Sequence, residues 1–259
     1  MKTRFILSLA AAVLPLTLFA DLNSGLVAFY TFDGNGNNSA SSALNLSGNN
    51  ITYQAGRSGQ AASFNGTSSW MTTSDTVPIT GNQSRTVDVW LKPNSYTGRG
   101  NLVFWGSWSG LGDGFGTYLS DTSLGYALTS FHWLDYSSGP APITYSVGQW
   151  LNLAIAYDGT SRTVKFYLNG NDVGSYISYG DTGTQVNTAS SILKVGYNNI
   201  GTPPGGDWNT PFLGSMDDLR IYNRALSAAE VQALAVPEPS AMALLGMFSL
   251  VAAIRGIRK

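Results

Sequence analysis

Few side chains in this chain can act as acids, bases or nucleophiles. Its 259 residues include one histidine, His132 in FHWLDY, and no cysteine, so thiolate catalysis and cysteine-bound zinc or iron are excluded. A Ser-His-Asp triad would need His132, and no Gly-x-Ser-x-Gly turn is present. The glutamates are Glu230 and Glu238, near one end. Because a glycosidase needs two carboxylates across the sugar, it would have to use scattered aspartates, and we interpret the protein as non-enzymatic.

An oxygen-rich segment, FDGNGNNS at residues 32–39, follows an alternating segment. Its spacing departs from that of an EF-hand loop, which requires glycine at the sixth position and glutamate at the twelfth, where this chain has Asn38 and Leu44. The side chains could still offer oxygen to a hard cation such as Ca²⁺. The alternative is an Asx-rich turn that bonds its own backbone. The oxygen donors are Asp33, Asn35, Asn37 and Asn38.

Several tryptophans lie beside Gly, Pro or Ser, away from the cleanly alternating segments. Trp105 and Trp108 occur in VFWGSWSG, and the others in FHWLDYSSGP and TPPGGDWNTP. A flat indole can cover the apolar face of a sugar ring while neighbouring carboxylates bind its hydroxyls. The alternative is that these tryptophans plug the ends of the fold as core. The predicted ligand platform is Trp108, Trp133 and Trp208, with Asp113, Asp135 and Asp207 as polar partners.

Alternating segments predict the elements that would position these residues. In residues 85–93, RTVDVWLKP, and 149–159, QWLNLAIAYDG, apolar residues recur at every second position, which indicates half-buried strands. Asn169-Gly170 supplies the two positive-φ residues of a type I′ hairpin turn. Repeated hairpins without intervening helices favour an all-β sandwich of two antiparallel sheets.

One short helix is predicted at the end of this region. Ser227 and Glu230 form a capping box ahead of apolar residues, and Pro237 prevents the helix from continuing. No repeat or boundary interrupts the alternation, so residues 21–235 are predicted to form one domain.

The first 20 residues, MKTRFILSLAAAVLPLTLFA, have a basic start, an apolar centre and a small-residue exit. We interpret residues 1–20 as a secretory signal peptide rather than a buried helix. Residues 21–236 then hold nine basic and 14 acidic residues, a net charge of −5. Because phosphate binding requires clustered Lys and Arg, nucleic acid is not expected as a partner.

Five segments, in the order GLVAFYTFDG, SFNGTSSWMTTSD, TVDVWLKPN, GQWLNLAIAYDGTSRTVKFYLNG and FLGSMDDLRIYNRALSAAEVQAL, resemble the laminin-G-like, concanavalin-A-like domains of bacterial exported proteins. The resemblance implies a jelly-roll sandwich that binds glycans or other extracellular ligands. It also implies a calcium ion between the turn after the first strand and the Asp-Asp pair of the last strand. Asp33, Asn38 and Asp217 are the corresponding positions.

The alternation of side chains along the last strand predicts which face of the sheet Asp217 occupies. In SMDDLRIY it shares a face with Leu219 and Ile221, while Asp218 lies on the face of Met216. A buried Asp217 would need donors or a cation to offset its desolvation. A purely hydrogen-bonded Asp217 and a metal ligand both satisfy this requirement.

Residues 236–259 resemble the Pro-Glu-Pro C-terminal (PEP-CTERM) sorting signals of Gram-negative bacteria, with VPEPS, an apolar run and the basic end RGIRK. The run from Ala241 to Ile254 has 14 residues, whereas a spanning helix needs roughly 17 to 25. The resemblance implies processing by an exosortase while this hydrophobic tail helix is transiently inserted in the inner membrane, with permanent anchoring as the alternative.

Together these features predict an exported binding module for extracellular polysaccharide, at the cell surface or in the matrix. The alternatives are a structural matrix protein without a specific ligand and an aspartate-based glycosidase.

Overall fold

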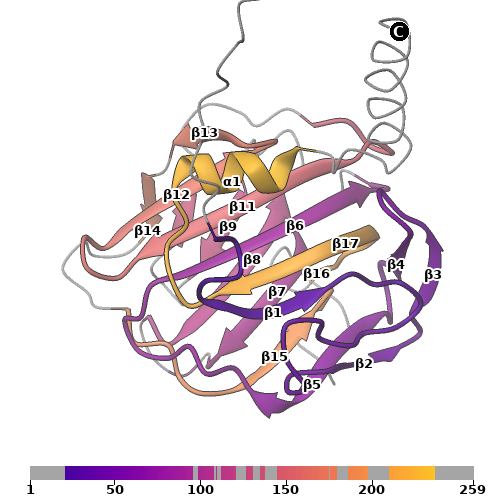
Figure 1. Cartoon of the computed structure of the whole chain (residues 1–259), viewed down its shortest axis with the longest axis horizontal. Coiled ribbons are helices and arrows are strands. Elements are labelled where there is room, and N and C mark those ends of the chain that lie inside the picture. Colours follow the sequence, from indigo (N-terminus) through magenta and orange to yellow (C-terminus); the bar gives the residue numbers. More distant parts are fainter. Residues whose placement is uncertain are drawn as a thin grey trace, which may run out of the picture.

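The computed structural model describes residues 21–95, 99–107, 109, 112–120, 127–130, 135–137, 145–174, 176–179, 186–197 and 210–236. The predicted signal peptide and the sorting segment after Val236 lie outside the described residues. Within these ranges, two β-sheets pack face to face and one short helix covers the outside of one of them (Figure 1). No helix of this part of the chain is long and apolar enough to cross a membrane. The predicted all-β sandwich of the jelly-roll type is confirmed.

The first sheet carries both the chain's first and its last strand. Its strand order is β13-β12-β11-β6-β17-β4-β3, and β1 also pairs with β17. All of these pairs are antiparallel. The strands are β1 (Leu26–Tyr30), β3 (Thr52–Ala55), β4 (Gln60–Asn65), β6 (Arg85–Pro93), β11 (Leu151–Asp158), β12 (Thr163–Leu168), β13 (Asn171–Gly174) and β17 (Leu213–Tyr222).

The second sheet has the order β14-β10-β9-β8-β7-β15-β5-β2. A short strand, β16, adds to β7 in parallel, whereas the other pairs are antiparallel. The strands are β2 (Leu46–Asn49), β5 (Trp70–Thr76), β7 (Arg99–Gly106), β8 (Gly114–Ser120), β9 (Ala127–Ser130), β10 (Asp135–Ser137), β14 (Tyr176–Tyr179), β15 (Ile192–Val195) and β16 (Thr210–Pro211).

The main core lies between the two sheets and takes the apolar alternate residues of β6 and β11, as predicted. The prediction that these strands are only half-buried is wrong, because their other face is buried too. A second apolar cluster on that face joins Ala154 and Tyr167 to Val231 and Leu234 of helix α1 (Ala228–Ala235). Helix α1 therefore acts as a cover for the outer face of the first sheet (Figure 1).

Local sequence signals explain two of the connections. Asn169 and Gly170 have φ angles of 49° and 78°, which confirms the two-residue turn between β12 and β13. The capping box of α1 is present: the Ser227 hydroxyl accepts from the Glu230 backbone, and the Glu230 carboxylate accepts from the Ser227 backbone N–H at 2.7 Å. Helix α1 ends at Ala235.

Strand β17 contains an irregularity that overturns the parity prediction for Asp217. Met216 lies opposite Leu91 and Asp217 opposite Trp90, but the next paired residue is Arg220, opposite Asp88. Three residues along β17 therefore pair with two residues along β6, which is a β-bulge. Asp218, with a φ of 51°, lies in this bulge. Asp217 therefore faces away from the main core and is buried on the side of Trp90 rather than on the Leu219 face.

Candidate functional site

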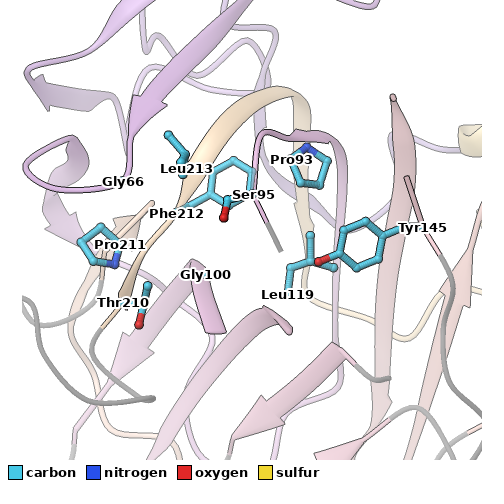
Figure 2. Close-up of a pocket in the computed structure, with 10 residues that line it drawn as sticks. All are labelled: Gly66, Pro93, Ser95, Gly100, Leu119, Tyr145, Thr210, Pro211, Phe212 and Leu213. Atoms are coloured by element: carbon cyan, nitrogen blue, oxygen red, sulfur yellow. The ribbon is translucent and has the colours of Figure 1, made fainter. Parts of the chain in front are cut away.

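A hollow of about 80 Å³ lies at one end of the sandwich, where β7, β16 and the start of β17 meet. Figure 2 shows Thr210 and Pro211 on one side of it, Tyr145 and Pro93 on the other, and the Tyr145 hydroxyl directed toward Leu119. Ser95 contributes a further hydroxyl to the lining.

A second hollow, of about 240 Å³, is also lined by Tyr145. Trp150 and Leu168 supply apolar surface here, while Ser146 and Gln149 supply polar atoms. Tyr145 thus lines both hollows, and we call the residues around them the end surface. It is defined by Pro93, Ser95, Tyr145, Ser146, Gln149, Trp150, Asn169 and Thr210.

Backbone bonds hold the Tyr145–Trp150 segment against the first sheet. The Gly148 N–H donates to the Pro93 carbonyl at 2.8 Å, and Gly148 has a φ of 77° that suits glycine. The neighbouring β12–β13 turn is tied to β11, because the Asn152 N–H donates to the Asn169 side-chain oxygen at 2.9 Å. The two aromatic side chains are therefore presented by ordered backbone.

The chemistry of the end surface suits binding. Aromatic and proline faces alternate with hydroxyl and amide groups, which is the combination that a sugar requires for its ring faces and its hydroxyls. Among the described residues, neither hollow is lined by a carboxylate or a histidine. These side chains therefore offer hydrogen bonds and apolar contact rather than proton transfer.

The predicted tryptophan platform falls mostly outside the described residues. This applies to Trp108, Trp133, Trp208 and Asp207, and also to His132 and the side chain of Asp135. Trp105, by contrast, is a core residue of β7: it is fully buried, packs on Phe115 at 4.4 Å between ring centroids, and donates its N–H to the Ile79 carbonyl. The core interpretation holds for this tryptophan.

Asp113 is the one predicted platform residue whose side chain lies within the described residues. Asp113 lies at the β7–β8 turn, where it accepts from the Ser109 hydroxyl at 3.0 Å. Thr210, which belongs to the end surface, pairs with Gly100 near the opposite end of β7. The tryptophan platform stays a prediction, and Asp113 does not belong to the end surface.

Asp33 and Asp217, the two acidic candidates for a metal, meet at one turn. Asp217 Oδ2 accepts from the backbone N–H groups of Arg57 and Ser58 at 2.8 and 3.2 Å, and Asp33 Oδ1 accepts from that of Gln60 at 2.7 Å. Asp217 Oδ1 is buried and has no hydrogen-bond partner. Burial raises the pKa of Asp217 to about 6, although the N–H groups of Ser58 and Arg57 lower it.

Only some of the predicted calcium ligands have an oxygen atom available for a cation. The Asn38 side-chain oxygen accepts from the Phe29 and Ala40 N–H groups, and its amide nitrogen donates to the Val27 and Ala43 carbonyls. Asn38 thus serves the backbone, as the Asx-turn interpretation expects. Asp217 Oδ1 and the exposed Asp33 carboxylate fit as oxygen donors, but in the described ranges no group of three acidic or histidine side chains could hold a metal ion. Calcium stays a prediction.

Glu230 has a structural role, because it caps helix α1 and pairs with Arg224. Arg224 contacts its carboxylate at 2.7 Å, and this interaction, with the bonds from Ser227, lowers the pKa of Glu230 to about 2. A carboxylate that stays ionised in this way does not act as a general acid near neutral pH.

Sequence reasoning missed Tyr145 and Trp150 as binding candidates. Trp150 was only the residue before an alternating strand, and ITYSVGQW contains no motif. The signal that could have identified them is a pair of aromatic residues flanking a glycine turn just before a strand, since sandwich loops carry binding residues.

The matching family model and the solved structures agree with this architecture. Residues 65–232 match the Laminin_G_3 model of the concanavalin A-like lectin/glucanases superfamily. Domain 4 of AbnA, a GH43 extracellular arabinanase from Geobacillus stearothermophilus solved with arabinotriose, has a TM-score of 0.63 and 26% identity. The match covers 82% of this chain and 99% of that one.

Two more distant structures share the fold alone. The binding domain of Paraclostridial Mosquitocidal Protein 1 has a TM-score of 0.59 and 16% identity, over 82% of this chain and 52% of that one. The botulinum neurotoxin type G receptor-binding domain has a TM-score of 0.58 and 13% identity, over 82% and 51%. No curated protein sequence matches significantly. By its family match, which spans more than half of its length, this chain belongs to the concanavalin A-like lectin/glucanase superfamily.

Proposed function

We propose that this protein is a non-enzymatic module that binds extracellular polysaccharide through the end surface. The observation that carries the proposal is that Tyr145 lines two hollows, one of which is also lined by Trp150, and that hydroxyl or amide groups line both. Two adjacent hollows suit consecutive sugar units of a chain better than a single small molecule.

The comparison with the arabinanase domain supports a glycan as the ligand. The match covers 82% of this chain and 99% of that domain, which was solved with arabinotriose. The absence of carboxylates from the described lining of the end surface favours binding over hydrolysis, since hydrolysis needs an acid and a second carboxylate on either side of the bond.

A glycan array and affinity electrophoresis of the full-length chain test the proposal, with arabinan among the polysaccharides. We expect retention by at least one polysaccharide and its loss in Trp150→Ala and Gln149→Ala. Gln149 is exposed, so its replacement should leave stability within about 0.5 kcal/mol.

Matched controls separate binding from folding. Tyr53→Ala removes a half-buried aromatic residue from edge strand β3, and Gln232→Ala removes an exposed glutamine from α1. Both should retain the polysaccharide. If the parent chain is retained by no glycan, the proposal fails and the structural matrix protein takes its place.

We also propose export to the cell surface or extracellular matrix of a Gram-negative bacterium, with exosortase processing of the C-terminal segment. The support is the sequence of the two ends. Intact mass of the protein from its native host tests this: loss of residues 1–20 and of most of the segment after Pro237 is expected, whereas an unprocessed chain of 259 residues would contradict it.

A further inference from the structure

A third hollow, of about 260 Å³, lies on the outer face of the first sheet, apart from the end surface. Its walls come from residues 22–23, strands β1, β6 and β17, the 56–60 turn, and the end of α1 with Val236 after it. No residue of the end surface lines it. A function for this hollow is therefore independent of the proposed polysaccharide site.

Two arginines line this hollow, and the guanidinium group of each lies on an aromatic ring. Arg57 Cζ is 3.6 Å from the centre of the Trp90 ring, and Arg220 Cζ is 3.9 Å from that of Phe29. A guanidinium that stacks through its face still donates N–H groups from its edge, in a fork that matches a carboxylate. The stacking also fixes both groups before any ligand arrives, which lowers the entropic cost of binding.

The local charge of the hollow is opposite to that of the domain. Residues 21–236 carry a net charge of −5 and only nine basic residues, yet two of these line the hollow and Asp218 is its only acidic lining residue in the described chain. Arg220 contacts Asp218 Oδ1 at 3.7 Å and donates to the Asp218 carbonyl at 3.3 Å. With two guanidinium groups and one carboxylate, the described lining favours an anion of low charge.

Tyr222 adds an unsatisfied polar atom to the same lining. Its side chain is fully buried, and its hydroxyl has no hydrogen-bond partner. Burial raises the pKa of Tyr222 to about 12, so the hydroxyl keeps its proton and can donate. Buried hydroxyl groups are normally paired, which makes this one a candidate contact for a ligand.

We propose that this hollow binds a sugar acid, a monosaccharide unit that carries a carboxylate. Arg57 and Arg220 bind the carboxylate, and the Tyr222 hydroxyl and the Asp218 carboxylate bind the ring hydroxyls. The volume is below the usual range for drug-sized ligands, about 300–1,000 Å³, and suits a single sugar ring.

Two other ligand classes fit less well. A neutral sugar would stack on exposed aromatic faces, but here the guanidiniums cover the rings of Trp90 and Phe29. A phosphate dianion would be repelled by Asp218, which instead suits the hydroxyl donors of a sugar.

Isothermal titration of the full-length chain with glucuronate and galacturonate tests the proposal, with glucose, galactose and inorganic phosphate at equal ionic strength as comparisons. We expect the two sugar acids to bind and the neutral sugars to bind at least about tenfold more weakly, a difference of about 1.4 kcal/mol. Equal affinity for neutral sugars, or tighter binding of phosphate, would overturn the proposal.

Conservative variants link the binding to these residues. Tyr222→Phe removes only the unpaired hydroxyl, so the melting temperature should not fall while the affinity for the sugar acid drops about tenfold. Arg220→Lys keeps the positive charge but loses the paired N–H donors of the planar guanidinium, so it should also lower the affinity about tenfold. Arg162→Lys, at an exposed position, is the matched control. Unchanged affinity in Tyr222→Phe and Arg220→Lys would refute the site, and Trp150→Ala should leave sugar-acid binding intact even if the proposed polysaccharide site fails.

Discussion

Asp33 and Asp217, separated by most of the chain, hold the same turn from its two sides. Asp217 binds the N–H groups of Arg57 and Ser58, and Asp33 binds that of Gln60. The Gly56 N–H closes the turn by donating to the Gly59 carbonyl at 3.0 Å. Because the same turn carries Arg57 over Trp90, the two carboxylates also shape the outer hollow.

Gly59→Ala should destabilise the protein by about 2–4 kcal/mol. Gly59 has a φ of 59°, and a methyl group there would overlap Asp33 Oδ1. Gly174→Ala is the matched control, since Gly174 has a φ of 78° but open space around it, and should cost only about 1 kcal/mol. Urea unfolding measures both; equal losses would show that the contact with Asp33 is unimportant.

Calcium should raise the melting temperature, and chelation should reverse the rise, because an ion bound only to the folded state stabilises it. The buried, unpartnered Asp217 Oδ1 is the expected ligand. Since the pKa of Asp217 is raised to about 6, protons compete with the ion, and the effect should be larger at pH 8 than at pH 5. Asp217→Asn should abolish it. A melting curve indifferent to calcium and chelator leaves Asp217 as a hydrogen-bonded structural residue.

Asp88 should make the protein less stable as the pH rises. Burial raises the pKa of Asp88 from 3.8 to about 7, despite its hydrogen bond from Asn152. Because the folded-state pKa is the higher one, folding takes up a proton; the stabilisation is complete below about pH 4 and is lost as the pH rises through about 7.

Asp88→Asn should therefore flatten the fall in unfolding free energy between pH 5 and pH 8, a change on the order of 2–4 kcal/mol. Asp75→Asn, at the exposed end of β5, should keep the slope of the parent. Identical slopes for Asp88→Asn and the parent would show that Asp88 is ionised throughout this range.

Arg85→Lys should cost about 2–4 kcal/mol. The Arg85 guanidinium is fully buried and donates to the Thr188 hydroxyl and to the carbonyls of Gly81 and Gln83. A lysine ammonium cannot reach three acceptors spread around a planar fork. Arg162→Lys at an exposed position should change stability by less than about 0.5 kcal/mol, and denaturant unfolding compares the two; similar losses would contradict this role.

Local signals in the sequence predicted the elements well. The alternation in residues 85–93 and 151–158 predicted β6 and β11, and Asn169-Gly170 and the Ser227 capping box predicted the hairpin and the start of α1. These signals depend on neighbouring residues, whose periodicity and φ preferences are already fixed along the chain.

What the sequence alone determined is the class of fold, the hairpin turn and the start of the closing helix. Only the tertiary structure decided which face Asp217 occupies, because one extra residue at Asp218 shifts the alternation of β17 relative to β6. It also decided that Trp105 is core, that Tyr145 lines two hollows, and that Arg57 lies on Trp90. Such contacts join segments far apart in the chain, and their partners are chosen by strand order and packing, which no local pattern encodes.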